Sequence, residues 1–348
     1  MNLYLTKPGR LKRKDNTLQF IIFESAENQF TMDDETPLDE DNAIVTKRNL
    51  PVEVVDAVYL FNEVRLNTKL LNFMAQKLIP VHIFNYWGHH TGTFMPHAVQ
   101  YSGDLVIEQS LAFKEIKRRM TICRAITESK LHNQLSVLQY YQRRKKGLGE
   151  AINALKEIKS AAASAETPEQ LMGFEGLAAR KYYSVWHVWL SEVEKDFTRQ
   201  YRPPDNPVNA LISFLNSLLY TACVSELYRT ALYPGISYIH APQSRRFSLA
   251  LDLVEPFKPL MVDRLIFRLF SRGDISGNDF QIHGNGTLLT DKGRQKILKA
   301  WDEQLHTTVS YPSLKRSVSY RQLLRLDCYK MIKHLLENQG YKPYRISY

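Results

Sequence analysis

The sequence has few cysteines and lacks several familiar motifs. It contains only Cys123, Cys223 and Cys328, and because no two of them form a C-x-x-C pair, neither a zinc ribbon nor a disulfide framework is supported. The G-x-x-x-x-G-K-[ST] loop of nucleotide hydrolases is absent as well. No apolar run approaches the roughly 20 residues that span a bilayer, and residues 1–15 lack the apolar centre of a secretory signal. These absences predict a cytoplasmic protein in a reducing compartment, without a membrane segment.

Apolar residues, by contrast, are plentiful. Of the 348 residues, 44% are hydrophobic and 11% are aromatic. This composition excludes a disordered tail, a collagen-like fibre and a disulfide-stapled miniprotein. Because domains most often have roughly 100–150 residues, the length of the chain predicts two domains.

Positive charge is concentrated in the second part of the chain. Residues 1–97 contain 10 Lys and Arg against 12 Asp and Glu, whereas residues 98–348 contain 36 against 24. The net charge of +10 therefore comes entirely from the second part. Such an excess is typical of a protein that binds a polyanion such as nucleic acid, and equally of a solvated basic surface. Charge alone does not decide between the two.

The first part of the sequence predicts strands. Apolar, β-prone segments occur at Leu18–Phe23, Ala43–Thr46, Val52–Leu60 and Ile79–Phe84, with one short helix at Thr68–Gln76. Turn residues are found at Asn85–Gly88 and again at His90–Thr93, and the acidic segment Asp33–Asp41 is expected to be a solvated loop. Residues 1–97 are therefore predicted to form a small β-rich domain.

The second part has helical periodicity. Helices are predicted at Leu105–Arg144, Leu148–Ser164, Thr167 to about Leu190, Asn206–Arg229, Ser244–Phe270, Thr290–His306 and Tyr320–Glu337. A hairpin turn is expected on Asn285-Gly286, and the tail Gly340–Tyr348 is expected to be a frayed terminus. The fold class is therefore a multidomain α+β protein, in which the β-rich domain of residues 1–97 precedes a larger all-α domain of residues 98–348.

One acidic residue lies on the wrong face of a predicted helix. In the helix that starts at Thr167, Glu175 lies four residues after Leu171 and three before Ala178, so it follows the apolar stripe rather than the solvated face. A carboxylate turned inward is paired, protonated or bound to a metal. A structural ion pair or a half-exposed edge of the stripe would produce the same placement.

A second group of candidate residues lies around His240. This histidine ends the segment Gly235–His240, in a connection after one helix, and Asp252 and Glu255 lie three residues apart on the next helix. Pro256 follows Glu255 directly, and we expect it to bend the helix because proline in a helix interior costs about 3 kcal/mol.

A cation is expected between these two carboxylates because they would otherwise repel each other. Arg245, Arg246 or a divalent metal ion would supply the charge. One imidazole with two or three carboxylates forms a mixed nitrogen and oxygen site, which suits Mn²⁺ or Mg²⁺ better than zinc or copper. Such a spacing also arises by chance in a chain with 36 acidic residues.

Several segments, taken in order, resemble one known family along nearly the whole chain. They are Leu50–Glu63, Ile79–Pro96, Lys130–Gln134, Phe174–Arg180, Asn206–Leu211, Gly235–His240 and Ser248–Pro259. The chain resembles the CRISPR-associated endonuclease and integrase that inserts new spacers into CRISPR arrays, the CRISPR-associated protein one family.

This resemblance implies a set of functional residues. Glu175 matches the glutamate of the family's E-G-x-x-A-R segment, His240 matches its histidine, and Glu255 matches the last acid of its D-x-x-[DE] pair. The resemblance implies that these three residues are catalytic and bind Mn²⁺ or Mg²⁺. Asp252 matches the first acid of that pair, and the resemblance implies that it lies close to the metal. Some members have Asp where this chain has Glu255, which changes the position of the ligand oxygens.

The resemblance also implies partners and a reaction. The β-rich domain would help to form a homodimer, a small ferredoxin-like CRISPR-associated protein would join it, and the helical domain would bind double-stranded DNA of protospacer and repeat. The reaction would be attack of a DNA 3′-hydroxyl, or of water, on a phosphodiester. Two other functions stay open from the sequence: a metal-dependent nuclease of branched DNA in repair, and a non-catalytic DNA-binding scaffold.

Overall fold

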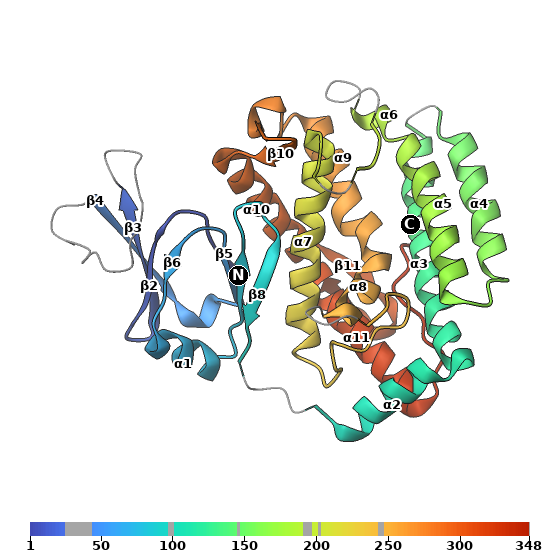
Figure 1. The fold of residues 1–348 in the computed structure, drawn as a ribbon, viewed down its shortest axis with the longest axis horizontal. Helices are drawn as coiled ribbons and strands as arrows, with labels where there is room; N and C mark the ends of the chain where they lie inside the picture. The colour runs from blue at the N-terminus through green and yellow to red at the C-terminus, as the bar shows by residue number, and fades with distance from the viewer. Residues whose placement is uncertain are drawn as a thin grey trace. The chain divides into compact units, whose positions relative to one another are not determined.

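The computed structural model describes residues 1–24, 44–96, 101–144, 147–190, 197–200, 203–242 and 247–347. The acidic segment Asp33–Asp41, together with Arg245 and Arg246, lies outside these ranges. The chain divides into two compact units, Met1–Ala98 and Val99–Tyr348, each described separately below (Figure 1).

In its described residues the first unit has two four-stranded sheets, one α-helix and a short 3₁₀ turn at Val52–Val54. Its elements are β1 (Asn2–Leu5), β2 (Gly9–Lys14), β3 (Thr17–Glu24), β4 (Ile44–Pro51), β5 (Ala57–Leu60), β6 (Val64–Arg65), α1 (Thr68–Gln76), β7 (Val81–Phe84) and β8 (His90–Phe94). The strand orders are β1-β5-β7-β8 and β4-β3-β2-β6. The predicted β-rich character and the predicted helix α1 are confirmed. The prediction of a turn at His90–Thr93 was wrong, because these residues pair with β7 as strand β8.

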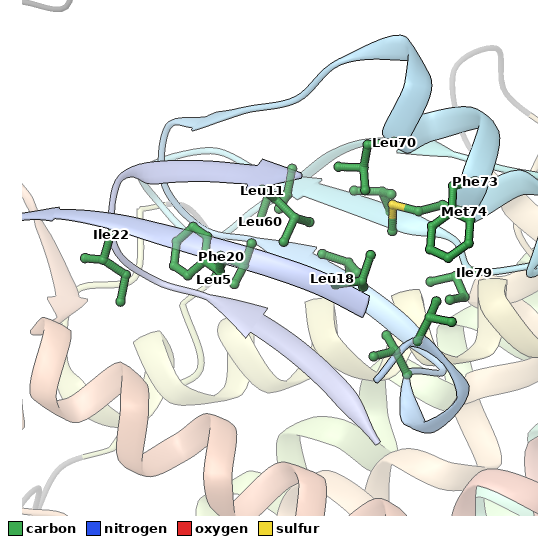
Figure 2. Packing of buried hydrophobic residues seen from close by; sticks show 14 residues of the cluster. Leu5, Leu11, Leu18, Phe20, Ile22, Leu60, Leu70, Phe73, Met74 and Ile79 are labelled. Atoms are coloured by element: carbon green, nitrogen blue, oxygen red, sulfur yellow. The ribbon is translucent and has the colours of Figure 1, made fainter. Parts of the chain in front are cut away.

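The core of this unit joins both sheets to α1. Leu18, Phe20 and Ile22 alternate along β3 and so point to one face, where they meet residues of β5 and α1. Figure 2 shows Leu70, Phe73 and Met74 of α1 among these strand side chains. The apolar, β-prone segment that predicted β3 from the sequence therefore supplies side chains of the core.

The second unit is mainly helical. Its helices are α2 (Gly103–Lys114), α3 (Ile116–Gln142), α4 (Gly149–Ala162), α5 (Pro168–Ser184), α6 (His187–Leu190), α7 (Pro207–Leu227), α8 (Ser248–Val254), α9 (Arg264–Arg272), α10 (Asp291–His306) and α11 (Tyr320–Glu337). Helices α3, α4 and α5 pack side by side (Figure 1). The predicted helix Leu105–Arg144 is interrupted at Glu115, whose extended backbone ends α2.

Two short hairpins correct the prediction that this part is entirely helical. Strands β9 (Phe280–His283) and β10 (Gly286–Leu289) form the hairpin that the Asn285-Gly286 pair predicted. Strands β11 (Thr308–Tyr311) and β12 (Arg316–Ser319) form a second hairpin that the sequence did not indicate. The overall class, a strand-rich region followed by a helical one, is confirmed.

Helix α7 is the central apolar helix of this unit. By length and composition alone it could cross a membrane, contrary to the expectation that no run is long enough, but 78% of its apolar window is buried inside the protein. Asn206 caps it by accepting a hydrogen bond from the backbone N–H of Asn209 at 2.8 Å, and Pro207 is its first residue. The helix is therefore a buried core element of the unit.

The C-terminal segment is packed, which contradicts the expected frayed terminus. Tyr341 and Ile346 are buried, and the ring of Tyr344 stacks on Phe257 with centroids 5.7 Å apart. Asn133 of α3 accepts a hydrogen bond from the N–H of Ile346 at 2.8 Å. The segment thus supports the region between α3 and α8.

Candidate active site

The three residues that the sequence singled out line one pocket of the helical unit. The pocket has a volume of about 280 Å³, and Glu175, His240 and Glu255 lie on its wall together with Lys130, Lys258 and Asp263. Glu175 comes from α5, His240 from the connection before α8, and Glu255 from the turn after α8. The structure therefore brings the predicted residues together from three separate elements.

Glu175 points inward, as the helical pattern predicted. Its neighbours on the apolar stripe, Leu171 and Ala178, are buried, and the Glu175 side chain is only 20% exposed. Its Oε1 accepts a hydrogen bond from the Nζ of Lys130 at 2.5 Å. Glu175 thus takes part in an ion pair, one of the two simpler explanations of its placement, while it also lines the pocket.

Lys130 connects two of the acids. Its Nζ also donates to Oε2 of Glu255 at 2.6 Å, and its side chain is 9% exposed. Burial alone would lower the pKa of Lys130, but the charges of Glu175 and Glu255 raise it above its usual range. The ammonium group is therefore charged and lies between the two carboxylates.

Glu255 is buried among cations. Lys258 donates to its Oε1 at 2.6 Å, so each carboxylate oxygen of Glu255 has one lysine. Burial alone would raise the pKa of Glu255, but Lys130 and Lys258 hold it well below its usual range. Glu255 is consequently a charged carboxylate at neutral pH.

The backbone at Glu255 leaves the α-helical pattern, as Pro256 predicted. Glu255–Phe257 form a 3₁₀ turn and Lys258–Asp263 a π-helical turn before α9 begins. Pro256 has no N–H to donate, and its carbonyl accepts a hydrogen bond from Nδ2 of Asn133 at 2.6 Å. Such π segments occur often at functional sites. The irregular turn places Glu255, Lys258 and Asp263 on the same pocket.

Asp252 holds His240 in place. Its carboxylate accepts hydrogen bonds from the backbone N–H groups of Tyr238, Ile239 and His240 and from Nδ1 of the imidazole, the last at 2.7 Å. Burial alone would lower the pKa of His240, but Asp252 outweighs that effect and the pKa is raised. Because Nδ1 is used in this way, Nε2 is the nitrogen that is left to act as a ligand.

Three residues of the pocket received no role from the sequence. Lys130 and Lys258 supply the cations on Glu255, and Asp263 lines the same pocket while only 3% exposed. Burial raises the pKa of Asp263 to about 7, although both lysines act to lower it. The available signal was a run of polar residues on the buried face of α3, where Lys130 is followed by Asn133 and Gln134.

The types of donor atom in the pocket fit a hard divalent cation, but the side chains are not arranged around one. Carboxylate oxygens of Glu175 and Glu255 and one imidazole nitrogen of His240 are the ligand types that Mn²⁺ accepts. Within the described parts of the chain, however, no group of three or more His, Cys, Asp and Glu side chains is placed to hold a metal ion. Between the two glutamates lies the ammonium group of Lys130, which already supplies a positive charge there.

Comparison with known proteins places the chain in a family. The model of the family "CRISPR associated protein Cas1" matches residues 3–303. The chain is 38% identical over 343 residues to the CRISPR-associated endonuclease Cas1 of Clostridium perfringens, covering 98% of this chain and 97% of that protein.

Solved structures agree with this assignment. A CAS1 protein from Thermotoga maritima has a TM-score of 0.81 at 34% identity, with 98% of this chain and 99% of that chain covered. A casposase bound to an integration product has the same fold, with a TM-score of 0.79 at 20% identity over 100% of this chain and 96% of its own. The match of the family model and the identity to full-length relatives show that the chain belongs to the Cas1 family of CRISPR-associated proteins.

Proposed function

We propose that this chain is a divalent-metal-dependent DNA endonuclease and integrase that inserts new spacers into a CRISPR array. The observation that carries the proposal is the meeting of Glu175, His240 and Glu255 on one pocket of a Cas1-family chain. The Clostridium relative bears the name endonuclease, and the casposase of the same fold was solved with an integration product. The excess of Lys and Arg in residues 98–348 supports DNA as the partner.

The proposed reaction exchanges one phosphodiester for another. A DNA 3′-hydroxyl attacks phosphorus and loses its proton, a new P–O bond forms, and the bond to the leaving 3′-oxygen breaks as that oxygen takes up a proton and becomes a free 3′-hydroxyl. A bound Mn²⁺ or Mg²⁺ would neutralise the charge that grows on the phosphate oxygens. With water as the nucleophile, the same pocket would hydrolyse DNA.

The residues of the chain have distinct parts in this proposal. Glu175, His240 and Glu255 would hold the ion, and Asp252 would orient the imidazole through its bond to Nδ1 without itself ligating the ion, because its carboxylate already accepts four hydrogen bonds. Lys258 is 29% exposed at the pocket, where its ammonium group would attract a phosphate.

The proposal includes the partners and the place of action. The first unit would form a homodimer. The exposed side chains of Ile83, Tyr86 and Trp87, at and beside β7, support this association. A small ferredoxin-like CRISPR-associated protein would join the dimer, and the assembly would act in the cytoplasm on protospacer and repeat DNA. Equilibrium sedimentation of the chain alone would measure the first of these associations.

The test is strand transfer in vitro with matched variants. Purified protein is incubated with a repeat-containing plasmid, a short duplex and Mn²⁺, and separately with branched DNA. Glu175→Gln, His240→Gln and Glu255→Gln should each lower strand transfer and cleavage by roughly 100-fold or more, because charge stabilisation at phosphorus is lost. DNA affinity should stay within about threefold, since it depends on Lys and Arg contacts to phosphate.

The control is Glu128→Gln, which removes a carboxylate of the same unit that pairs with Arg345 at 3.0 Å outside the pocket. It should retain full activity. A variant of the three that keeps wild-type strand transfer would remove that residue from the site. Cleavage of branched DNA without joining of the duplex would favour a repair nuclease, and DNA binding without any product would favour a scaffold.

A further inference from the structure

Lys130 occupies an unusual place for a lysine. Its side chain comes from α3 and reaches two glutamates that lie 45 and 125 residues away in sequence, one on α5 and one after α8. The distances from Nζ to the two carboxylate oxygens are 2.5 and 2.6 Å. With an exposed side-chain fraction of 9%, the ammonium group is almost completely removed from solvent.

The charges around Lys130 are those that a divalent ion would use. Two carboxylates from separate elements converge on one small cation, and the same two carboxylates would hold the metal ion in the proposed function. A divalent ion added while Lys130 stays would place like charges a few ångströms apart in a poorly solvated pocket, which is strongly unfavourable. Both cations therefore cannot bind the same pair of oxygens.

We propose that Lys130 holds the place of the metal ion in the free protein and that its ammonium group leaves Glu175 and Glu255 when the ion binds. This inference rests on the proposed function, because it takes the two glutamates as ligands. Lys130 is then a positioning residue: it keeps two buried carboxylates paired and oriented until the ion replaces it.

The side chain and the pocket suit such an exchange. A lysine carries a compact charge on a flexible four-carbon stem, so its ammonium group can move without a change of the helix. The pocket of about 280 Å³ offers another buried carboxyl group, that of Asp263, to a displaced ammonium. A displaced Lys130 would thus still have an acid within the same pocket.

The experiment compares Mn²⁺ binding in wild type, Lys130→Met and Lys130→Arg. Isothermal titration gives the Mn²⁺ affinity, and thermal unfolding is recorded in EDTA and in Mn²⁺. The matched control is Lys159→Met, which removes a lysine of α4 that pairs with Glu128 at 3.9 Å, outside the pocket.

Lys130→Met should bind Mn²⁺ roughly tenfold more tightly than wild type, because the ion no longer competes with a resident charge. In EDTA its melting temperature should be lower, since two buried carboxylates lose their cation, and Mn²⁺ should raise it by more than it raises that of wild type. Lys130→Arg, which keeps the charge, and Lys159→Met should bind Mn²⁺ as wild type does.

The results separate the inference from the proposed function. Equal or weaker Mn²⁺ binding by Lys130→Met overturns the inference alone, since Lys130 would then support the bound ion. If neither wild type nor Lys130→Met binds Mn²⁺, and Glu175→Gln retains strand transfer, then both the inference and the proposed function are overturned. Should Lys130→Met fail to fold in EDTA, folding on addition of Mn²⁺ supports the inference and persistent unfolding contradicts it.

Discussion

Two buried glutamates of the helical unit hold their cations in different ways. Glu226 of α7 is completely buried and accepts from Nε of Arg321 at 2.7 Å and Nε of Arg325 at 2.6 Å, both on α11. Glu255 is 3% exposed and accepts from Lys130 and Lys258 at 2.6 Å each. Arg229 lies 4.0 Å from Glu226 as a third cation. Each acid therefore has at least two cations, but only Glu255 lies on the pocket.

The difference shows what separates a structural ion cluster from a candidate site. Arginine forms a planar, fixed fork of donors, so the Glu226 cluster joins α7 to α11 rigidly. Lysine presents a single mobile charge, and the Glu255 cluster shares one lysine with another acid, Glu175. Burial of a charged group is common to both clusters. What distinguishes the site is the pocket, the lysine that two acids share, and the use of lysine in place of arginine as the partner of Glu255.

The largest expected effect on stability comes from breaking the arginine cluster. Glu226→Gln would leave Arg321 and Arg325 facing a neutral amide, and the free energy of unfolding should fall by about 3–5 kcal/mol. Glu255→Gln should lower it by only about 1–3 kcal/mol, because Lys130 keeps Glu175 and Lys258 is partly exposed to solvent.

Urea denaturation measures this difference through tryptophan fluorescence, because Trp186, Trp189 and Trp301 lie in this unit. The comparison predicts opposite rankings for stability and activity: Glu226→Gln should lower stability more, and Glu255→Gln should lower strand transfer more. Equal losses of stability in the two variants would mean that the clusters do not differ as the geometry indicates.

A smaller, pH-dependent effect is expected at Asp263, the third acid of the pocket. Burial raises its pKa to about 7 in the folded protein, against about 3.9 in an unfolded chain. Between these values the folded protein holds a proton that the unfolded chain has lost, so this group lowers stability as the pH rises. The slope is at most about 1.4 kcal/mol per pH unit.

Asp263→Asn cannot ionise and should lose this dependence. Its free energy of unfolding relative to wild type should increase from about pH 4 to pH 7 and change little above that. Urea denaturation in EDTA over this range provides the measurement. A difference between variant and wild type that stays constant with pH would show that Asp263 does not hold a proton in the folded pocket.

Local signals predicted much of the fold. Thr167 and Asn206, the first residues of two predicted helices, each precede a proline, and in the structure they cap α5 and α7. The Asn285-Gly286 pair predicted the β9–β10 hairpin, whereas the β11–β12 hairpin has polar, largely exposed strands and no such pair. Where chemistry at adjacent positions decides the structure, the sequence was therefore sufficient.

The site was only partly accessible from the sequence. Glu175 was recognised because one helical stripe contained a carboxylate, and the bend after Glu255 followed from Pro256. The role of Lys130 was not recognised, because packing of elements distant in sequence brings its two glutamate partners to it. A single lysine in a helix of 27 residues carries no local signal of these contacts. The placement of Glu175, His240 and Glu255 as ligands stays a prediction.

The smallest expected effect concerns the N-terminal caps of the two helices that contain Glu175 and Glu226. Thr167 caps α5, the helix of Glu175, by accepting from the N–H of Gln170 at 3.2 Å, and Asn206 caps α7, the helix of Glu226. Thr167→Ala and Asn206→Ala should each lower the free energy of unfolding by about 1 kcal/mol.

Hydrogen exchange should distinguish the two variants. Loss of the Thr167 cap should speed exchange in the first turn of α5 alone, because that end of the helix is exposed. The Asn206 side chain also donates to Asp205, so its loss should loosen the connection before α7 as well. Fast exchange spreading from Thr167→Ala to the turn of Glu175 would show that the pocket depends on this cap, and strand transfer should then fall below that of the Glu128→Gln control.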